Sequence, residues 1–564
     1  MTNRRRFLAA CAASGLTSTL FPGLLWAQMK QGTKPVTLEM VRESARLAGL
    51  AWSDAECQEL TDSLSSLAAG AEQIDKPTLT NASPLPFHFD PRPPGTTLRL
   101  PAAGLTLPAP AAVQRPRSVE SLAFAPVTSL ARLLQSKQIT SVELTRMYLD
   151  RLKRHNATLN CVVTITEERA LGEAAAADAE IAAGKYRGAL HGVPYGVKDI
   201  VAAKGYPTKW GAPPLEHQTF DEDATVVRRL HDAGAVLVAK LTTGELAFGD
   251  QWAGGRTNNP WNLGEGSSGS SAGSAAATAA GLVAFAIGSD TGGSILSPSV
   301  RCGLVGLRPT FGRVSRHGVM AAGTTLDKIG PLCRYAADCA VVLGAIAGPD
   351  NLDLAVPEGV PFGWDGSRPV HPTRIGYVPA MFDAETDADR RSNNSRALDV
   401  LRRLGCTMQP VTLPGGDLSY FIEYTERAAA FDSLTNTGLY KGVRQRTSRF
   451  LRACQLVTAV DYLQANRRRL VIMEAVARVM ETVDAILFTT LTLDSTTSLN
   501  PVMSLTGHPS IAVPNGFTST GSPAGVMFSG HLYREDTLIS LALAYQAATG
   551  DSQKQPPLFA VDRG

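Results

Sequence analysis

The sequence has few aromatic residues and no excess charge of either sign. Of its 564 residues, 6% are aromatic, 19% are charged and 44% are hydrophobic, a composition that excludes collagen-like and disordered chains. Three of the 54 lysines and arginines lie in residues 1–28, which hold no acidic residue, so the rest of the chain carries 51 basic and 51 acidic side chains. This neutral body lacks the electrostatic footprint of a protein that binds nucleic acid or an anionic membrane, and we expect neither partner.

Motifs that bind metals or form disulfide networks are also missing. The eight cysteines include no Cys-x-x-Cys pair, and the nine histidines include no His-Glu-x-x-His spacing. In a chain of this length, cysteines so scattered do not form a disulfide framework. The sequence therefore predicts chemistry without a metal, and nothing in it implies a cofactor.

The first 28 residues predict an export signal. Three arginines at positions 4–6 precede Phe-Leu, and a moderately apolar run follows to Trp26. The run has the length of a signal peptide and is too short and too rich in Ser, Thr and Gly for a stable membrane span. The arginine pair resembles a bacterial twin-arginine (Tat) signal. We expect cleavage after Ala27 and a periplasmic or secreted protein that keeps no membrane span.

Between this signal and the main body, the pattern predicts a helical appendage (29–75) and an extended arm (76–120). Residues 38–48 have helical periodicity, and a second helix opens at Ser53 with Glu56 as its capping-box partner. The arm holds ten prolines, a density that neither a helix nor a central strand tolerates.

From residue 121 to 555, helical and strand patterns alternate. The expected strands are 160–165, 236–239, 283–287, 485–488, 510–514 and 525–529. The expected helices include one that opens within 139–143, one at 167–183 and one at 535–548. This alternation predicts one large α/β domain around a mixed sheet covered by helices.

Residues 264–274 form a glycine- and serine-rich segment that fits three interpretations. Gly-x-Gly-x-x-Gly at 264–269 matches a dinucleotide-binding turn, and Gly-x-Ser-x-Gly at 269–273 matches a nucleophile elbow. Both need a strand immediately before them, whereas 258–262 has the composition of a turn. By itself, the composition is typical of a flexible loop.

Two further segments indicate serine chemistry. Residues 288–295 (Gly-Ser-Asp-Thr-Gly-Gly-Ser-Ile) follow an apolar strand, and their glycines let backbone N–H groups converge on an anion. Ser294, at the end of this turn, would have a nucleophile and an oxyanion hole in one place. Lys198 ends another apolar stretch. Burial lowers the pKa of a lysine by several units, and the amine then accepts a proton from a serine near pH 7.

Together these segments resemble the amidase signature family. The matching motifs are 190–199, 259–262, the glycine/serine signature at 266–308, Leu326 to Pro331 and, less strongly, 501–530. The resemblance covers residues 121–350 and 480–550. It implies the fold of the family and hydrolysis of carboxamide C–N bonds through a serine acyl-enzyme.

The resemblance also implies a Ser–cis-Ser–Lys triad. Lys198 corresponds to the base, Ser270 to the proton-relaying cis-serine and Ser294 to the nucleophile. Ser268 and Ser271 are alternatives for the relay if the register of the loop differs. The implied oxyanion donors are the backbone N–H groups of Thr291, Gly292, Gly293 and Ser294.

The chain departs from the family just after the nucleophile. The family commonly has an arginine there, whereas this chain has Leu296 and Ser297. Arg301 would take the place of the family's arginine if its side chain reaches the pocket. Because a carboxylate buried beside Leu296 would lose solvation without gaining a partner, we expect neutral amides to be preferred.

The predicted substrate is a small-molecule amide, with esters or carbamates as further candidates. Two alternatives stay open: a catalytically inactive binding protein on the same scaffold, and a protein like the A component of the amidotransferase that acts on charged tRNA. The residues that line the acyl pocket are expected around 350–480. Monomer and homodimer are both compatible with the sequence.

Overall fold

The computed structural model describes the chain in eight stretches. They are residues 37–47, 52–61, 81, 87–108, 113–368, 373–454, 457–489 and 501–562. The chain divides into two units, the first made of 1–80 with 456–460 and the second of 81–455 with 461–564. The predicted signal at 1–28 lies outside the described stretches. Within them, no helix combines the length and apolar character that crossing a membrane requires.

The first unit contains two helices where the sequence predicts them. They are α3 (Leu38–Leu47) and a helix through residues 54–61. The predicted capping box is present, because the Ser53 N–H donates to Glu56 Oε2 (2.6 Å) and the Glu56 N–H donates to Ser53 Oγ (3.3 Å). This exchange satisfies two N–H groups, and the capping-box prediction is confirmed. Cys57, which is fully buried, packs in a small apolar cluster of this unit.

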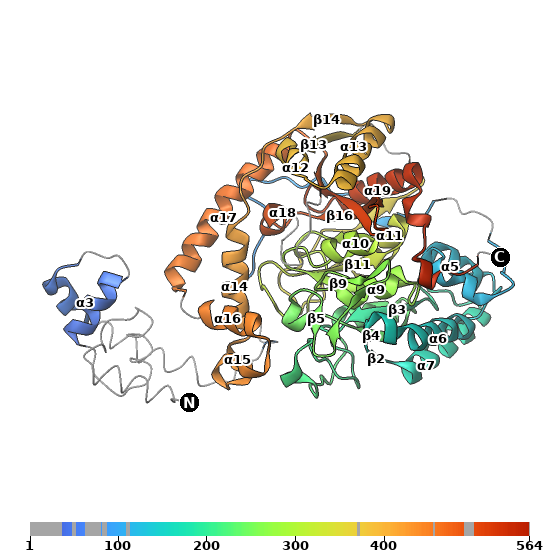
Figure 1. Cartoon of the computed structure of the whole chain (residues 1–564), viewed down its shortest axis with the longest axis horizontal. Helices are drawn as coiled ribbons and strands as arrows, with labels where there is room; N and C mark the ends of the chain where they lie inside the picture. The colour runs from blue at the N-terminus through green and yellow to red at the C-terminus, as the bar shows by residue number, and fades with distance from the viewer. Residues whose placement is uncertain are drawn as a thin grey trace. The chain divides into compact units, whose positions relative to one another are not determined.

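The second unit is built on a large mixed sheet, in which eleven strands are described (Figure 1). In order across the sheet they are β14 (Thr407–Pro410), β13 (Arg374–Tyr377), β15 (Ala485–Thr489), β17 (Pro523–Gly530), β16 (Ser510–Phe517), β10 (Val305–Arg308), β11 (Lys328–Cys333), β9 (Phe285–Asp290), β3 (Pro194–Lys198), β4 (Val236–Leu241) and β2 (Val162–Ile165). The pairs β13–β14, β13–β15, β3–β4 and β3–β9 are parallel, and the other pairs are antiparallel. The predicted α/β class with a mixed sheet is confirmed.

Strand predictions succeeded because the strands are buried. Every residue of β4, β9 and β15 is buried, and each of these strands contains an apolar run that the sequence shows, although β4 also holds Lys240 and β9 ends in Asp290. Each of the six predicted strands overlaps an observed one, with ends that shift by a few residues. Strands β3 and β9 lie side by side, which brings the end of the Lys198 segment next to the Ser294 segment.

Helices cover this sheet. Those of the second unit are α5 (Val127–Gln135), α6 (Ser141–Leu159), α7 (Glu167–Ala182), α8 (Thr225–Asp232), α9 (Ala272–Ala279), α10 (Leu296–Cys302), α11 (Ala336–Ile346), α12 (Pro379–Asp383), α13 (Ala388–Arg403), α14 (Leu418–Ala430), α15 (Asp432–Asn436), α16 (Gln445–Ala453), α18 (Pro501–Leu505) and α19 (Glu535–Thr549). The helix α17 (Ala459–Met480) begins in the first unit and continues in the second. The predicted helices at 167–183 and 535–548 correspond to α7 and α19. Thr140 and Glu143 form a capping box at the start of α6, as expected.

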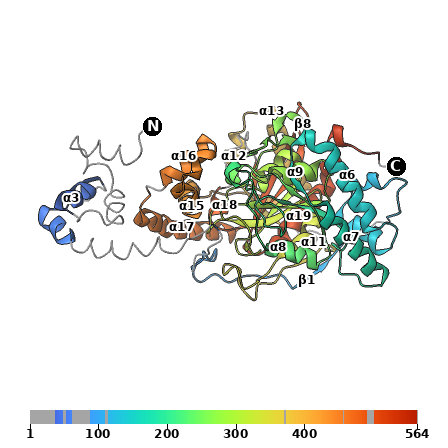
Figure 2. The same cartoon turned by 90° about the horizontal axis from the view of Figure 1, so that it is seen from below.

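The two ends of the second unit carry different helices. In both views, α15 and α16 lie at one end, and α6 and α7 lie at the opposite end (Figures 1 and 2). The helices α9 and α10 follow the two serine-bearing segments directly. Their packing against the sheet fixes where those segments lie.

Two segments outside the sheet test further expectations. In the proline-rich arm, residues 87–108 and 113–118 contain no helix, a turn lies at 94–95, and β1 (Gly104–Thr106) pairs with β12 (Gly363–Asp365). The turn expected at 258–262 is flanked by two short strands, β7 (Asn258–Asn259) and β8 (Asn262–Gly266). The expectation that no strand precedes the glycine/serine segment is therefore wrong. The turn residues themselves pair as a short β7–β8 hairpin, which forms a two-stranded sheet separate from the large one.

Candidate active site

Lys198 is the last residue of β3, and its amine is completely buried. Its Nζ donates to Ser270 Oγ (2.6 Å) and to Ser289 Oγ (2.8 Å). Burial lowers the pKa of Lys198 to about 7, an effect that the more distant carboxylates of Asp290 and Asp327 only partly oppose. A large fraction of the amine is therefore neutral at pH 7 and able to accept a proton.

The neighbouring Asp199 holds the end of this strand in place. Its carboxylate pairs with Lys240 Nζ at 2.8 Å, and both side chains are fully buried. The other carboxylate oxygen accepts the backbone N–H of Lys209 at 2.9 Å. Asp199 thus neutralises one buried lysine and leaves Lys198 without a direct carboxylate partner among the described residues.

Of the three serines considered for the relay, Ser270 is the one that hydrogen-bonds to Lys198. The Gly269–Ser270 peptide bond is cis. Gly269 is required here, because a Cβ at this position would lie 1.9 Å from the carbonyl oxygen of Gly249. The two alternatives for the relay have other partners. Ser268 Oγ pairs with Ser297 Oγ (2.7 Å), and Ser271 Oγ donates to the carbonyl oxygen of Ser289 (3.1 Å).

Ser294 lies in the turn between β9 and α10, and it lines a pocket. Asp290, at the end of β9, organises this turn, since its carboxylate accepts the backbone N–H groups of Gly293 and Ile295, each at 2.8 Å. Arg308 lies 3.4 Å from the same carboxylate, and both side chains are fully buried. The backbone of the nucleophile segment is therefore fixed from behind by a buried ion pair.

One of the four expected oxyanion donors, the N–H of Gly293, has another partner in the structure. The N–H of Gly293 donates to Asp290 within the turn, so it does not point to the pocket, and the prediction that it binds an oxyanion is not supported. The roles of Thr291, Gly292 and Ser294 as donors remain predictions. The carbonyl oxygen of Thr291 accepts a hydrogen bond from Ser504 Oγ.

A third buried lysine, Lys328, lies on the far side of this turn from the pocket. Lys328 Nζ donates to Ser504 Oγ (2.9 Å), the hydroxyl that binds Thr291. Burial places the pKa of Lys328 well below its usual value, and no described carboxylate forms an ion pair with it. Thr291 is also held by its own hydroxyl, which donates to Asp327 at 2.6 Å. The Thr291–Gly292 peptide unit is thus fixed through a lysine–serine pair.

The pocket at Ser294 has a volume of about 190 Å³. Its walls come from the loop 247–251, the turn 292–294 and the helices α14 and α16. The prediction that pocket residues lie within 350–480 is therefore confirmed for α14 and α16, whereas the loop 247–251 lies outside that range.

Aromatic rings form one wall of this pocket. Tyr424 of α14 stacks on Phe450 of α16, with ring centroids 4.7 Å apart. Tyr420 and Phe248 extend the group at centroid distances of 6.1 Å from Tyr424 and 6.4 Å from Phe450. Such a wall favours an apolar or flat part of a substrate next to the nucleophile.

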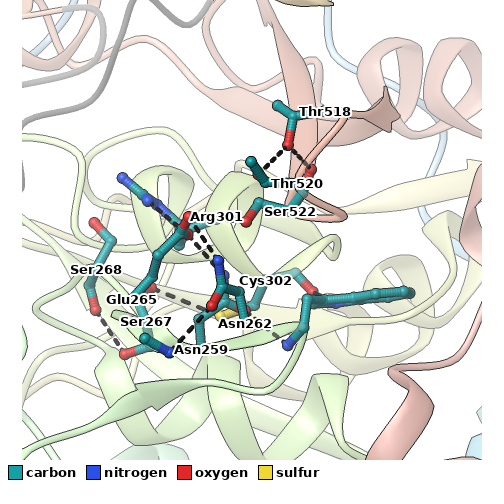
Figure 3. Close-up of polar contacts among 12 residues, drawn as sticks. Asn259, Asn262, Glu265, Ser267, Ser268, Arg301, Cys302, Thr518, Thr520 and Ser522 are labelled. Carbon is teal, nitrogen blue, oxygen red and sulfur yellow. Dashed lines mark hydrogen bonds and ion pairs between the residues drawn. The ribbon is translucent and has the colours of Figure 1, made fainter.

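Arg301 is occupied elsewhere (Figure 3). Its guanidinium pairs with Glu265 at 3.0 Å, and the same carboxylate accepts hydrogen bonds from Asn262 (3.1 Å) and Ser522 Oγ (2.9 Å). Arg301 does not line the pocket of Ser294. Leu296 is fully buried and is likewise absent from the pocket wall. The idea that Arg301 compensates for Leu296 is therefore wrong, because the ion pair holds it against the β7–β8 hairpin.

Several residues of the site were not singled out from the sequence. Ser289 and Asp290 lie inside the quoted motif, and their place at the end of a buried strand was a usable signal. Lys328 lies in the Leu326–Pro331 motif, but its burial depends on the sheet order. No cluster of three or more His, Cys, Asp or Glu side chains in the described stretches is arranged to hold a metal.

Comparisons with known proteins agree with this arrangement. A model of the Amidase family matches residues 143–539. The A component of glutamyl-tRNA(Gln) amidotransferase from Thermosynechococcus vestitus is 34% identical over 482 residues, which cover 77% of this chain and 99% of that protein. The protein of the same name from Coxiella burnetii is 35% identical, over 76% of this chain and 98% of that protein. The solved structure of native peptide amidase from Stenotrophomonas maltophilia is similar with a TM-score of 0.69 and 30% identity, over 78% of this chain and 100% of that one.

Fold, site and comparisons define a hydrolase of amides built on a large mixed sheet. The chain belongs to the amidase (amidase signature) family.

Proposed function

We propose that this protein hydrolyses carboxamides through a serine acyl-enzyme, with Ser294 as nucleophile, Ser270 as proton relay and Lys198 as base. The observation that carries this proposal is the 2.6 Å hydrogen bond between Lys198 Nζ and Ser270 Oγ, made by a buried amine whose pKa is lowered to about 7. A lysine in this state is a competent base at neutral pH.

In the first half of the reaction, Ser294 Oγ attacks the amide carbonyl carbon. Its proton passes to Ser270, and the proton of Ser270 passes to the neutral amine of Lys198. Negative charge develops on the carbonyl oxygen, where backbone N–H groups of the turn stabilise it. When the C–N bond breaks, the proton returns through Ser270 to the leaving amine, and the acyl group stays on Ser294.

In the second half, water takes the place of the amine. The same serine–lysine pair removes a proton from water, which attacks the ester carbon of the acyl-enzyme. The bond to Ser294 then breaks, the proton returns from Lys198 through Ser270 to Ser294 Oγ, and the acid is released. Because no step needs a redox change or a metal, the residues described are sufficient for the chemistry.

We propose linear amides as the main substrates and a periplasmic or secreted location. The location rests on the arginine-rich start of the sequence, which resembles a twin-arginine signal. A hydrolase outside the cytoplasm encounters neither charged tRNA nor ATP, so it has no use for partner proteins that act on them. This reasoning favours a free-standing enzyme.

A second candidate follows from the names of the relatives, which are A components of an amidotransferase at 34% and 35% identity. An enzyme of that type would act on the side-chain amide of glutamine. Hydrolysis of free glutamine, measured as ammonia release, distinguishes this candidate from a hydrolase of other amides. A catalytically inactive protein would do neither.

The test is covalent labelling of the protein with a fluorophosphonate together with turnover of a panel of aryl and alkyl amides. We expect the unmodified protein to be labelled and active. Ser294→Ala should lose both properties while its melting temperature changes little, because a single half-buried hydroxyl contributes little to stability. Labelling or turnover that persists in Ser294→Ala contradicts the nucleophile assignment.

A further inference from the structure

Arg446 places a cationic group at the pocket of Ser294. It lies in the first turn of α16, it is exposed, and it lines the pocket. Its guanidinium lies 5.9 Å above the centre of the Phe450 ring, next to the aromatic wall. In the described stretches no carboxylate forms an ion pair with it, so its charge is available to a ligand.

The other charged groups of the pocket have protein partners. Glu423 pairs with Arg427 at 2.7 Å, and Arg444 pairs with Glu245 at 3.2 Å. Asp250 accepts the backbone N–H of Ser268 at 3.1 Å, and burial raises its pKa. The ion pairs neutralise Glu423 and Arg444, and the hydrogen bond holds Asp250 next to Ser268.

We propose that Arg446 recognises an anionic group, such as a carboxylate, on the amide substrate, an inference that rests on the proposed amide hydrolysis at Ser294. The substrate anion would lie at the first turn of α16, next to the Arg446 guanidinium. The Phe450 ring beside Arg446 covers part of the guanidinium, and the low polarity of the aromatic wall strengthens the attraction between the charges. Arginine binds a carboxylate through two parallel N–H groups. The preference for neutral amides expected from Leu296 is therefore replaced by a preference for anionic ones.

Matched substrate pairs test this proposal on either side of the scissile bond. On the acyl side, the 4-nitroanilides of pentanoic acid and glutaric acid have the same chain length and differ in one carboxylate. On the amine side, a single acyl group is attached to 4-nitroaniline or to 4-aminobenzoate, whose nitro and carboxylate groups have the same shape. The readout for each pair is the ratio of kcat/KM for the anionic member to that for the neutral member.

The variant Arg446→Gln removes the charge and keeps a polar side chain. In at least one pair, we expect the ratio to favour the anion in the unmodified protein and to fall about fivefold in the variant, the scale of a partly exposed ion pair. Arg449→Gln is the control, because Arg449 is exposed on the same helix and is absent from the pocket wall. Its ratio should equal that of the unmodified protein. Added salt should lower the ratio in the unmodified protein and change it less in Arg446→Gln.

Binding without turnover separates this proposal from the proposed reaction. The affinities of the same four anilides are measured on Ser294→Ala with and without Arg446→Gln. If the unmodified protein turns over no amide but Arg446→Gln still weakens anion binding, the hydrolysis is refuted and the recognition stands. If Arg446→Gln changes neither the kinetic ratio nor the relative affinity in either pair, or if no anion binds, the role of Arg446 is refuted.

Discussion

The burial of Lys198 determines the pH range in which this site can work. An exposed lysine is almost fully protonated at neutral pH, whereas the buried amine of Lys198 has a pKa of about 7. The two hydroxyls that it contacts, on Ser270 and Ser289, are neutral hydrogen-bond partners, so they do not restore the charge as a carboxylate would. Desolvation is thus the main cause of its basic role.

This burial predicts the pH profile of the reaction. The neutral amine is the active form, so kcat/KM should fall about tenfold per pH unit below the pKa and level off above it. The measurement is kcat/KM for a neutral anilide from about pH 5 to about pH 9, with the inflection expected near 7. A profile with its inflection near the usual pKa of lysine would show that the amine is not desolvated during catalysis.

The adjacent serines 270 and 271 make a matched pair of variants. Ser270→Ala removes the hydroxyl bound to Lys198 and should lower kcat at least about 10²-fold, the usual scale for lost acid–base assistance. Ser271→Ala removes a hydroxyl that bonds to the backbone of Ser289, so its effect on kcat should be much smaller. Single-turnover acylation rates of both variants decide between the two serines. Equal losses would contradict the relay assignment.

At the scale of elements, the turn between β9 and α10 depends on a strand and a helix that come later in the sequence. β11 brings Lys328 behind the turn, and α18 brings Ser504 to the carbonyl oxygen of Thr291. A peptide unit is planar, so fixing the carbonyl of Thr291 also fixes the direction of the N–H of Gly292 on its opposite side. The packing of β11 and α18 therefore sets the orientation of an expected oxyanion donor.

Substitution of Lys328 tests this support. Lys328→Met removes the donor to Ser504 but keeps the volume, and we expect kcat to fall about tenfold with little change in KM, a fraction of the loss of a whole oxyanion donor. Lys328→Gln keeps a donor and should recover most of the activity. The measurements are kcat, KM and melting temperature. If Met and Gln variants have equal kcat, the hydrogen bond to Ser504 does not position the turn.

At the scale of the whole molecule, location decides which substrates the enzyme meets. The predicted signal lies in residues 1–28, and the remainder has equal numbers of basic and acidic side chains. The body thus has no net charge to attract polyanions, and we expect delivery to depend on the predicted signal.

Export is expected to depend on the arginine pair. Changing Arg4 and Arg5 together to lysine preserves the charge, so a signal that requires only charge would still function. For a twin-arginine signal, we expect the precursor to accumulate in the cytoplasm. Cell fractionation followed by immunoblotting measures this, with the unmodified chain as control. Unchanged periplasmic protein would refute the Tat assignment.

The sequence by itself determined the features that depend on neighbours along the chain. Buried strands appear as apolar runs, so β4 and β9 were predictable, and the capping boxes at Ser53 and Thr140 depend on residues three positions apart. The motifs around Lys198, Ser270 and Ser294 were evident for the same reason, because each lies within one short segment.

Only the tertiary structure decided which groups surround Ser294 and which do not. Arg446 and Tyr424 come from helices more than a hundred residues beyond the nucleophile, whereas Arg301, which is close in sequence, is held by Glu265 outside the pocket. Helix packing and ion pairs between distant segments set these directions. Burial of Lys328 likewise depends on its place between β9 and β10 in the sheet. Desolvation and long-range pairing belong to the folded chain, and no local pattern encodes them.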